Sequence, residues 1–180
     1  MLAAGVRDRH VSGSADEFSS LIERHLDGAY RLATVILGDA MEAEDVVHDA
    51  AISAWRHWSS LRDQDRFDAW FSRIVINACR DRLRSRRRRP VVELAPEQVG
   101  GEIGLIRPDG IESLASRDAL ARAFAVLDPD ELIVIVLRFW RDLTVEAIAG
   151  RTGTPAGTVK SRLHHALGRL RTALTIAEND

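Results

Sequence analysis

The most informative absences in this 180-residue chain concern cysteine, lysine and long apolar segments. The single cysteine, Cys79, excludes an internal disulfide framework and fits a reducing compartment, so we expect a cytoplasmic protein. No uninterrupted apolar run is long enough to cross a bilayer, and no apolar signal region follows the first residues. Lys160 is the one lysine among 25 basic residues, a bias typical of a GC-rich coding genome.

The sequence patterns of several enzyme classes are also missing. There is no Gly-x-Ser-x-Gly nucleophile elbow, no P-loop and no Cys/His spacing of a zinc site. Asp45 and His48 are three residues apart, as in the carboxylate–histidine ligand pairs of helical-bundle metalloproteins, but no second pair accompanies them. An all-helical metalloenzyme at these two residues is one alternative. We expect instead a protein that is not an enzyme and that has no metal or cofactor.

Charge is strongly segregated along the chain, although the formal net charge is only −2. Residues 80–89 contain seven arginines and one aspartate, and residues 138–172 contain seven bases and two acids. Residues 1–50 contain ten acids against four bases, and residues 91–137 contain nine acids against three bases. Two basic blocks, each at the end of an apolar-periodic helix, favour binding to the phosphate backbone of a nucleic acid.

Hydrophobic periodicity predicts an all-α fold, because almost every readable segment has helical spacing and alternating strand patterns are absent. The first expected helix opens with a capping box at Ser14 and Glu17 and stops near Gly38. Asp39 is expected to cap the second helix, which precedes a loop at residues 58–65.

A change of composition predicts a boundary between two small helical domains. A third helix is expected from Arg66 towards Arg88. Residues 90–111 then contain three prolines and four glycines without a sustained period, which is typical of a flexible linker. We therefore expect one domain over residues 14–89 and a second over residues 112–174.

The second domain has the pattern of a helix-turn-helix. Asp128 and Pro129 are expected to start a helix that continues to Trp140. A short helix, a glycine-containing turn and a longer helix opened by Thr154 and Pro155 follow. The apolar residues of the longer helix should face the core; they are Val159, Leu163, Ala166, Leu167 and Leu170.

The opposite face of this longer helix carries side chains that can read DNA. Arginine and lysine bond guanine edges in the major groove, and serine and threonine bond base edges or phosphates. The free amides at 154–157 could hold a phosphate at the helix start. An ordinary amphipathic helix is the alternative interpretation. A helix-turn-helix by itself does not separate repressors from activators or polymerase subunits.

The arginine cluster at residues 80–89 and an acidic helix face are the remaining signals. Trp58, Trp70 and Phe71 lie upstream of the cluster, and aromatic side chains beside a basic groove suit single-stranded bases. A solvated basic helix end and core aromatics are the alternatives. Glu44, Asp45 and Asp49 are expected to form an acidic face for a basic partner.

Together, three segments resemble the extracytoplasmic-function (ECF) sigma factors of bacterial RNA polymerase. They are "AEDVVHDAAISAW", "FDAWFSRIVINACRDRLRSRRRR" and "DLTVEAIAGRTGTPAGTVKSRLHHALGRLR". The resemblance extends from about residue 16 to 172 and leaves the linker unmatched. It implies that residues 14–89 form the promoter-melting (region 2-like) domain and that residues 112–174 form the −35-binding (region 4-like) domain.

The resemblance also implies three sets of functional residues. A core-binding set would dock on the clamp helices of the large polymerase subunit: Glu44, Asp45, His48, Asp49 and Trp55. A −10 set would capture and melt the non-template strand: Trp58, Leu61, Arg62, Asp63, Arg66, Asn77, Arg80, Asp81 and Arg84. A −35 set would read the upstream element: Thr154, Gly157, Thr158, Lys160, Ser161, Arg162, His164 and His165.

Two departures from the family pattern qualify these assignments. His164 and His165 stand where many relatives carry an aromatic residue or arginine, so the −35 sequence cannot be carried over. Asp81 places an acid beside the expected DNA strand.

The expected partners are core RNA polymerase, double- and single-stranded promoter DNA and an anti-sigma factor, which often holds family members inactive. The alternative is a stand-alone helix-turn-helix regulator that binds a palindrome as a dimer through residues 144–171. That alternative leaves the acidic helix and the arginine cluster unexplained.

Overall fold

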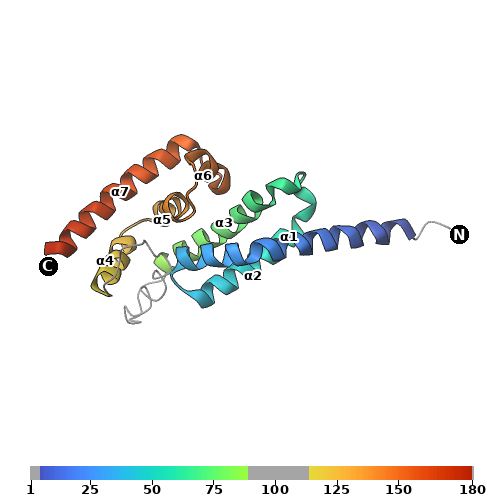
Figure 1. Cartoon of the computed structure of the whole chain (residues 1–180), viewed down its shortest axis with the longest axis horizontal. Coiled ribbons are helices and arrows are strands. Elements are labelled where there is room, and N and C mark those ends of the chain that lie inside the picture. Colours follow the sequence, from blue (N-terminus) through green and yellow to red (C-terminus); the bar gives the residue numbers. More distant parts are fainter. Residues whose placement is uncertain (1–4, 89–113, 180) are drawn as a thin grey trace.

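The structure, a computed structural model, describes the backbone of residues 5–88 and 114–179 and the side chains of residues 15–88 and 120–176. These two stretches are helical and contain no strand, so the predicted all-α class is confirmed (Figure 1). The linker predicted at residues 90–111 lies outside the described residues.

The first half of the chain consists of α1 (Gly5–Leu37), α2 (Ala40–Arg56) and α3 (Phe67–Arg88). Helix α1 stops at Gly38, whose φ of 69° is available to glycine without strain, as predicted. The Asp39 carboxylate accepts a 2.9 Å hydrogen bond from the Glu42 amide and caps α2, also as predicted.

The predicted start of the first helix at Ser14 was wrong. Helix α1 begins at Gly5 and runs through Ser14 without interruption. No proline occurs in residues 5–14, so the helical backbone hydrogen bonds can continue past the capping sequence.

Aromatic side chains hold the connection between α2 and α3 against α1. Two 3₁₀ turns, Trp58–Ser60 and Gln64–Arg66, form this connection. Buried Phe67 stacks on Phe71 with ring centroids 5.7 Å apart, and Phe18 of α1 meets Trp58 edge-to-face at 5.4 Å. Such pairs stabilise by about 1 kcal/mol beyond the burial of their area, so they fix the loop in place.

The second half consists of α4 (Leu114–Ala125), α5 (Pro129–Ile135), a π-helical turn η5 (Val136–Trp140), α6 (Val145–Thr152) and α7 (Ala156–Asn179). Pro129 begins α5 and the Asp128 amide donates to the Glu131 carboxylate at 3.0 Å, so the predicted start is confirmed. The α-helix predicted to continue to Trp140 instead ends in the π turn, where the Arg141 amide reaches the Val136 carbonyl.

The predicted helix-turn-helix is formed by α6, Gly153 and α7. Thr144 caps α6 through a 3.2 Å hydrogen bond from the Ala147 amide. Gly153 then adopts φ 65°, the left-handed conformation that ends a helix and that glycine adopts most easily. The chain turns here so that α7 starts at a new angle.

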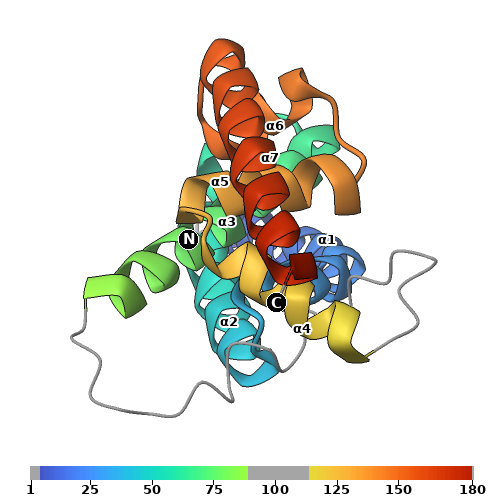
Figure 2. The same cartoon turned by 90° about the vertical axis from the view of Figure 1, so that its left-hand side faces the viewer.

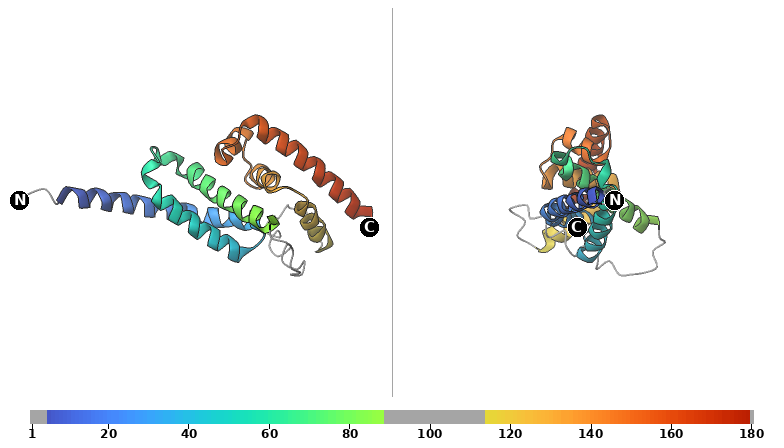
Figure 3. Two further views of the ribbon diagram at one scale, coloured as in Figure 1. Left: turned by 180° about the vertical axis from the view of Figure 1, so that it is seen from behind. Right: turned by 90° about the vertical axis from the view of Figure 1, so that its right-hand side faces the viewer.

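The two halves share one hydrophobic core. Val75 and Ile76 of α3 belong to the same buried cluster as Leu137, Ile148 and Val159 from the second half. Helix α3 contacts α1 and α2 on one side and α5 and α6 on the other. Figures 1 and 2, and the reverse view in Figure 3, show α3 between these two groups of helices.

Candidate nucleic-acid and protein interfaces

The core-binding set forms an exposed acidic face on α2. Glu44, Asp45, His48 and Asp49 are exposed, whereas the opposite side of the helix buries Ala43, Val46, Val47, Ala50 and Ala54 in the core. Among the described residues, none forms an ion pair with the carboxylates of Glu44, Asp45 or Asp49. This face is therefore available to a basic partner.

Trp55 adds an apolar edge to the acidic face. Its side chain remains 46% exposed, although its ring meets Phe18 edge-to-face at 5.1 Å. Asp45 and His48 share the helix surface, but the described part of the chain contains no group of three or more His, Cys, Asp or Glu side chains able to hold a metal.

The loop part of the −10 set divides into inward and outward side chains. Trp58 and Leu61 are half-buried and pack against the core, so Trp58 contributes to packing as well as to the loop surface. Arg62 is exposed. Arg66 lies 3.3 Å from Asp63, whose carboxylate also caps the second 3₁₀ turn.

An open groove runs between α2 and α3 beside this loop. Asn77 and Asp81 of the −10 set line it together with Asp49 of the core-binding set. Trp70, which the sequence singled out as an aromatic residue near the arginine cluster, also lines the groove. Ser53, His57 and Ser60 line it too, and the sequence did not assign them to the site. The four-residue spacing of positions 49, 53 and 57 was the available signal, because it places them on one helix face.

Five arginines of α3 pair with acids inside the chain: Arg80, Arg82, Arg84, Arg86 and Arg87. Arg80 Nη1 donates to Asn77 Oδ1 at 2.6 Å, and Arg80 Nε lies 2.7 Å from Asp130 Oδ1. Arg84 Nη2 donates to Asp130 Oδ2 at 2.9 Å. Arg86 pairs with the Glu42 carboxylate at the start of α2.

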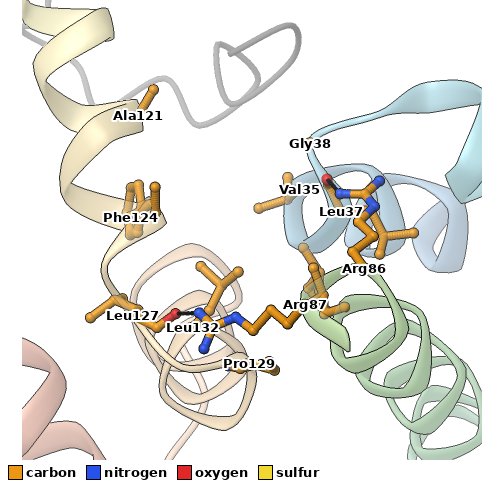
Figure 4. Close-up of a pocket in the computed structure, with 13 residues that line it drawn as sticks. Val35, Leu37, Gly38, Arg86, Arg87, Ala121, Phe124, Leu127, Pro129 and Leu132 are labelled. Carbon is orange, nitrogen blue, oxygen red and sulfur yellow. Dashed lines mark hydrogen bonds between the residues drawn. The ribbon is translucent and has the colours of Figure 1, made fainter. Parts of the chain in front are cut away.

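The end of α3 reaches both halves of the chain. Arg86 donates to the Leu37 carbonyl at 2.9 Å, whereas Arg87 donates to the Leu127 carbonyl on the far side of an apolar pocket (Figure 4). Arg87 also donates to the Asp128 carboxylate at 2.7 Å. These two arginines therefore extend in opposite directions from neighbouring positions.

The −35 set lies on the first three turns of α7 and on the turn before it. Thr158, Lys160, Ser161, His164 and His165 are exposed, and so is Gly157. The rings of the two histidines meet edge-to-face with centroids 5.9 Å apart.

Arg162 differs from the other members of the −35 set. It is half-buried and contacts Thr154 Oγ1 and Asp130 Oδ2, each at 3.4 Å. It therefore points towards α5 and not towards solvent.

The buried stripe of α7 differs from the prediction at Leu167. Val159 and Ala166 are fully buried and Leu163 and Leu170 are half-buried, but Leu167 is 41% exposed. It follows Ala166 by one residue, which turns it by about 100° away from the face that packs on α5.

Cys79 is a packing residue, as expected. Its side chain is fully buried in the shared core. Burial raises the pKa of the Cys79 thiol to about 12. The thiol therefore stays protonated near neutral pH, where it is a poor nucleophile.

Comparisons with known proteins identify the two halves. The model of Sigma-70 region 2 matches residues 21–89, which contain α2, the loop and α3, and the model of Sigma-70 region 4 matches residues 123–172, which contain the helix-turn-helix. The chain is 32% identical over 169 residues to RNA polymerase sigma-E factor of Streptomyces coelicolor, covering 93% of this chain and 92% of that protein.

The chain is also 34% identical to ECF RNA polymerase sigma factor SigL of Mycobacterium tuberculosis, covering 91% of this chain and 94% of that protein. The chain belongs to the ECF sigma factors. It is thus an RNA polymerase sigma factor acting in transcription initiation, and the stand-alone regulator is not favoured.

A solved structure shares the fold of this sigma factor. The sigma factor RpoE of Bartonella quintana, solved in complex with the anti-sigma factor NepR, superimposes with a TM-score of 0.63 at 25% identity. The match covers 88% of this chain and 97% of RpoE. Among the helices described here, none is long and apolar enough to span a membrane.

Proposed function

We propose that this sigma factor uses three surfaces: the acidic face of α2 for core polymerase, the loop and groove beside α3 for the −10 element, and the exposed face of α7 for the −35 element. The observation that carries the proposal is the exposed polar face of α7 directly after the Gly153 turn. A helix presented in this way can enter the major groove while its apolar stripe stays in the core.

At the −35 element, the side chains divide into base readers and phosphate holders. Lys160, His164 and His165 extend from exposed positions and can reach base edges. Thr154 and the amides at the start of α7 suit a phosphate, because the helix N-terminus carries partial positive charge. We assign the promoter preference of this chain to the two histidines, whose ring nitrogens can donate to or accept from a base.

At the −10 element, the groove between α2 and α3 suits a single-stranded base. Asn77 and Asp81 offer hydrogen-bonding groups and Trp70 offers an aromatic surface along the same groove. Flipping a base out of the duplex costs roughly a few kcal/mol. Binding energy from the groove, the arginines of α3 and the polymerase must offset that cost, so promoter opening requires the holoenzyme.

Control by an anti-sigma factor also belongs to this proposal. RpoE of Bartonella quintana was solved with such a partner, and we propose that this chain has one too. We further propose a cytoplasmic protein without catalytic activity or cofactor. Affinity purification of the tagged chain from its native cell tests the partner; recovery of core polymerase without any further stoichiometric protein would contradict it.

In-vitro transcription with core polymerase over a promoter library tests the DNA roles. His165→Ala should shift the set of −35 sequences that support transcription and should leave core binding unchanged. Thr172→Ala is the matched control, because Thr172 lies on the same helix, is exposed and stands outside the −35 set. An unchanged sequence preference for His165→Ala and His164→Ala together would contradict the assignment.

A further inference from the structure

We propose that Asp130, in the first turn of α5, is an internal latch that occupies the DNA-binding arginines of both domains in the free sigma factor. The inference rests on the proposed DNA roles of Arg80, Arg84 and Arg162. It adds a mechanism by which the chain limits its own binding to DNA before polymerase engages it.

The geometry of the latch is a single carboxylate shared by three arginines. Asp130 Oδ1 lies 2.7 Å from Arg80 Nε, and Asp130 Oδ2 accepts from Arg84 Nη2 at 2.9 Å. The same Oδ2 lies 3.4 Å from Arg162 Nη2. Two of the arginines come from the −10 set and the third from the −35 set.

Partial burial shields the contact between Arg80 and Asp130 from solvent. The side chains of Arg80 and Asp130 are only 13% and 20% exposed. Ion pairs that water screens less keep more of their Coulomb energy. Of the three contacts, that of Arg84 is a hydrogen bond, of the kind a guanidinium group also forms with a phosphate oxygen, and those of Arg80 and Arg162 are ion pairs. Asp130 therefore competes directly with DNA phosphates.

A second acid in the same turn supports the closed arrangement. Asp128 accepts from Arg87 of α3 at 2.7 Å and lies 3.2 Å from Arg169 of α7. On another part of the interface, Arg151 of α6 donates to Asp68 of α3 at 2.5 Å. Acid–base pairs thus connect the two domains at both ends of their contact.

The closed arrangement is incompatible with simultaneous binding of both promoter elements. By their names, the −10 and −35 elements are about 25 base pairs apart, or roughly 85 Å at about 3.4 Å per base pair. Arg84 and Arg162 lie within 3.4 Å of the same oxygen atom, Asp130 Oδ2. The two domains must separate before both arginines can reach their DNA sites, and separation breaks the latch.

Removing the carboxylate tests the proposal on the full chain without polymerase. Asp130→Asn keeps the shape of the side chain and removes its charge. We expect its affinity for two labelled probes of random sequence, a 20-base single strand and a 20-base-pair duplex, to rise at least about fivefold. Both affinities should rise together, because one carboxylate holds arginines of both domains. Fluorescence anisotropy at fixed salt gives the two values.

Two control variants distinguish the specific effect of the Asp130 carboxylate from the effect of a change in net charge. Asp130→Glu retains the carboxylate and should stay within about twofold of the parent chain. Asp27→Asn makes the same change of net charge at an exposed pair on α1 and should also leave both affinities unchanged. An equal gain in Asp27→Asn, or no joint gain in Asp130→Asn, would overturn the latch.

Folding and function are checked independently. If circular dichroism shows that Asp130→Asn has lost helix, Asp130→Ser, which suits a first helical turn, replaces it under the same criteria. Transcription by holoenzyme carrying Arg84→Ala or Arg162→Ala tests the DNA roles themselves. Full activity of both variants would refute the DNA roles of these two arginines, whereas reduced activity together with an unresponsive Asp130→Asn would refute only the latch.

Discussion

The acidic face of α2 and the basic end of α3 each gather charges of one sign but differ in whether their charges are paired. Glu44, Asp45 and Asp49 have no ionic partner among the described residues, whereas Arg80, Arg84 and Arg86 are all bound to internal acids. A run of like charges in a sequence therefore identifies a surface with capacity to bind, but not whether that surface is already occupied.

The largest effect should come from reversing the charge of the acidic face of α2, whose carboxylates have no ionic partner among the described residues. Asp45→Arg with Asp49→Arg places two positive charges where a basic partner is expected, and like-charge contacts cost several kcal/mol. We expect a loss of core-polymerase affinity of at least about 100-fold, measured by competition binding. Asp27→Arg on α1 is the control and should bind normally. Normal binding by the double variant would place the polymerase contact elsewhere.

The next largest effect should come from removing an arginine at the basic end of α3, where the arginines are paired with internal acids. Arg84→Ala removes a predicted phosphate contact of the −10 set, and we expect holoenzyme to open promoters about tenfold more slowly. Permanganate footprinting or a fluorescent base in the −10 strand measures the rate. Arg31→Ala removes an exposed arginine from α1 that also pairs with an aspartate, and it should have no effect. Equal rates in both variants would show that Arg84 serves only the contact with Asp130.

The salt dependence of DNA affinity reports a smaller effect, namely how many arginines are free to bind phosphates. Each arginine that reaches a phosphate adds about 0.9 to the slope of log affinity against log salt. On the duplex probe, Asp130→Asn should therefore steepen the slope by up to about 2.7 relative to the parent chain, because its three released arginines can bind phosphates. Anisotropy titrations at four salt concentrations give the slopes. Parallel lines would show that the arginines stay sequestered without the carboxylate.

The sequence predicted the local features of this fold well and the long-range pairings poorly. Gly38, the Asp39 cap, the start of α5 and the turn at Gly153 depend on neighbours within a few residues, so they were predictable. Arg84 and Asp130 are 46 positions apart, and nothing in either segment indicates the other.

The differences on single helices also have local causes that periodicity does not capture. The π turn after Ile135 places Val136 and Leu137 in the shared core. The side chain of Leu167 is 41% exposed, although its spacing from Leu163 and Leu170 predicted that it would be buried. Ser53 and His57 were missed because the α2–α3 groove exists only once the two helices pack.

The smallest effect concerns the apolar side of α3, where Cys79 lies. Its pKa of about 12 exceeds the ordinary value of 9.0, because burial disfavours the thiolate. The unfolded chain therefore loses this proton first as pH rises, so the contribution of the thiol to stability is complete below pH 9 and declines between pH 9 and 12. Alkylation at pH 8 should be slow in the folded chain and fast in denaturant. Rapid alkylation of the folded chain would contradict this burial.

Because the two halves share one hydrophobic core, separation of the two domains should depend on temperature. Opening uncovers part of the apolar surface around Leu137 and Ile148 that packs with α3. Exposure of apolar surface carries a positive heat-capacity change, and the attraction between apolar surfaces weakens on cooling. The closed arrangement should therefore become less stable as temperature falls. The equilibrium between the closed arrangement and the arrangement with separated, DNA-binding domains should then depend on temperature as well as on charge.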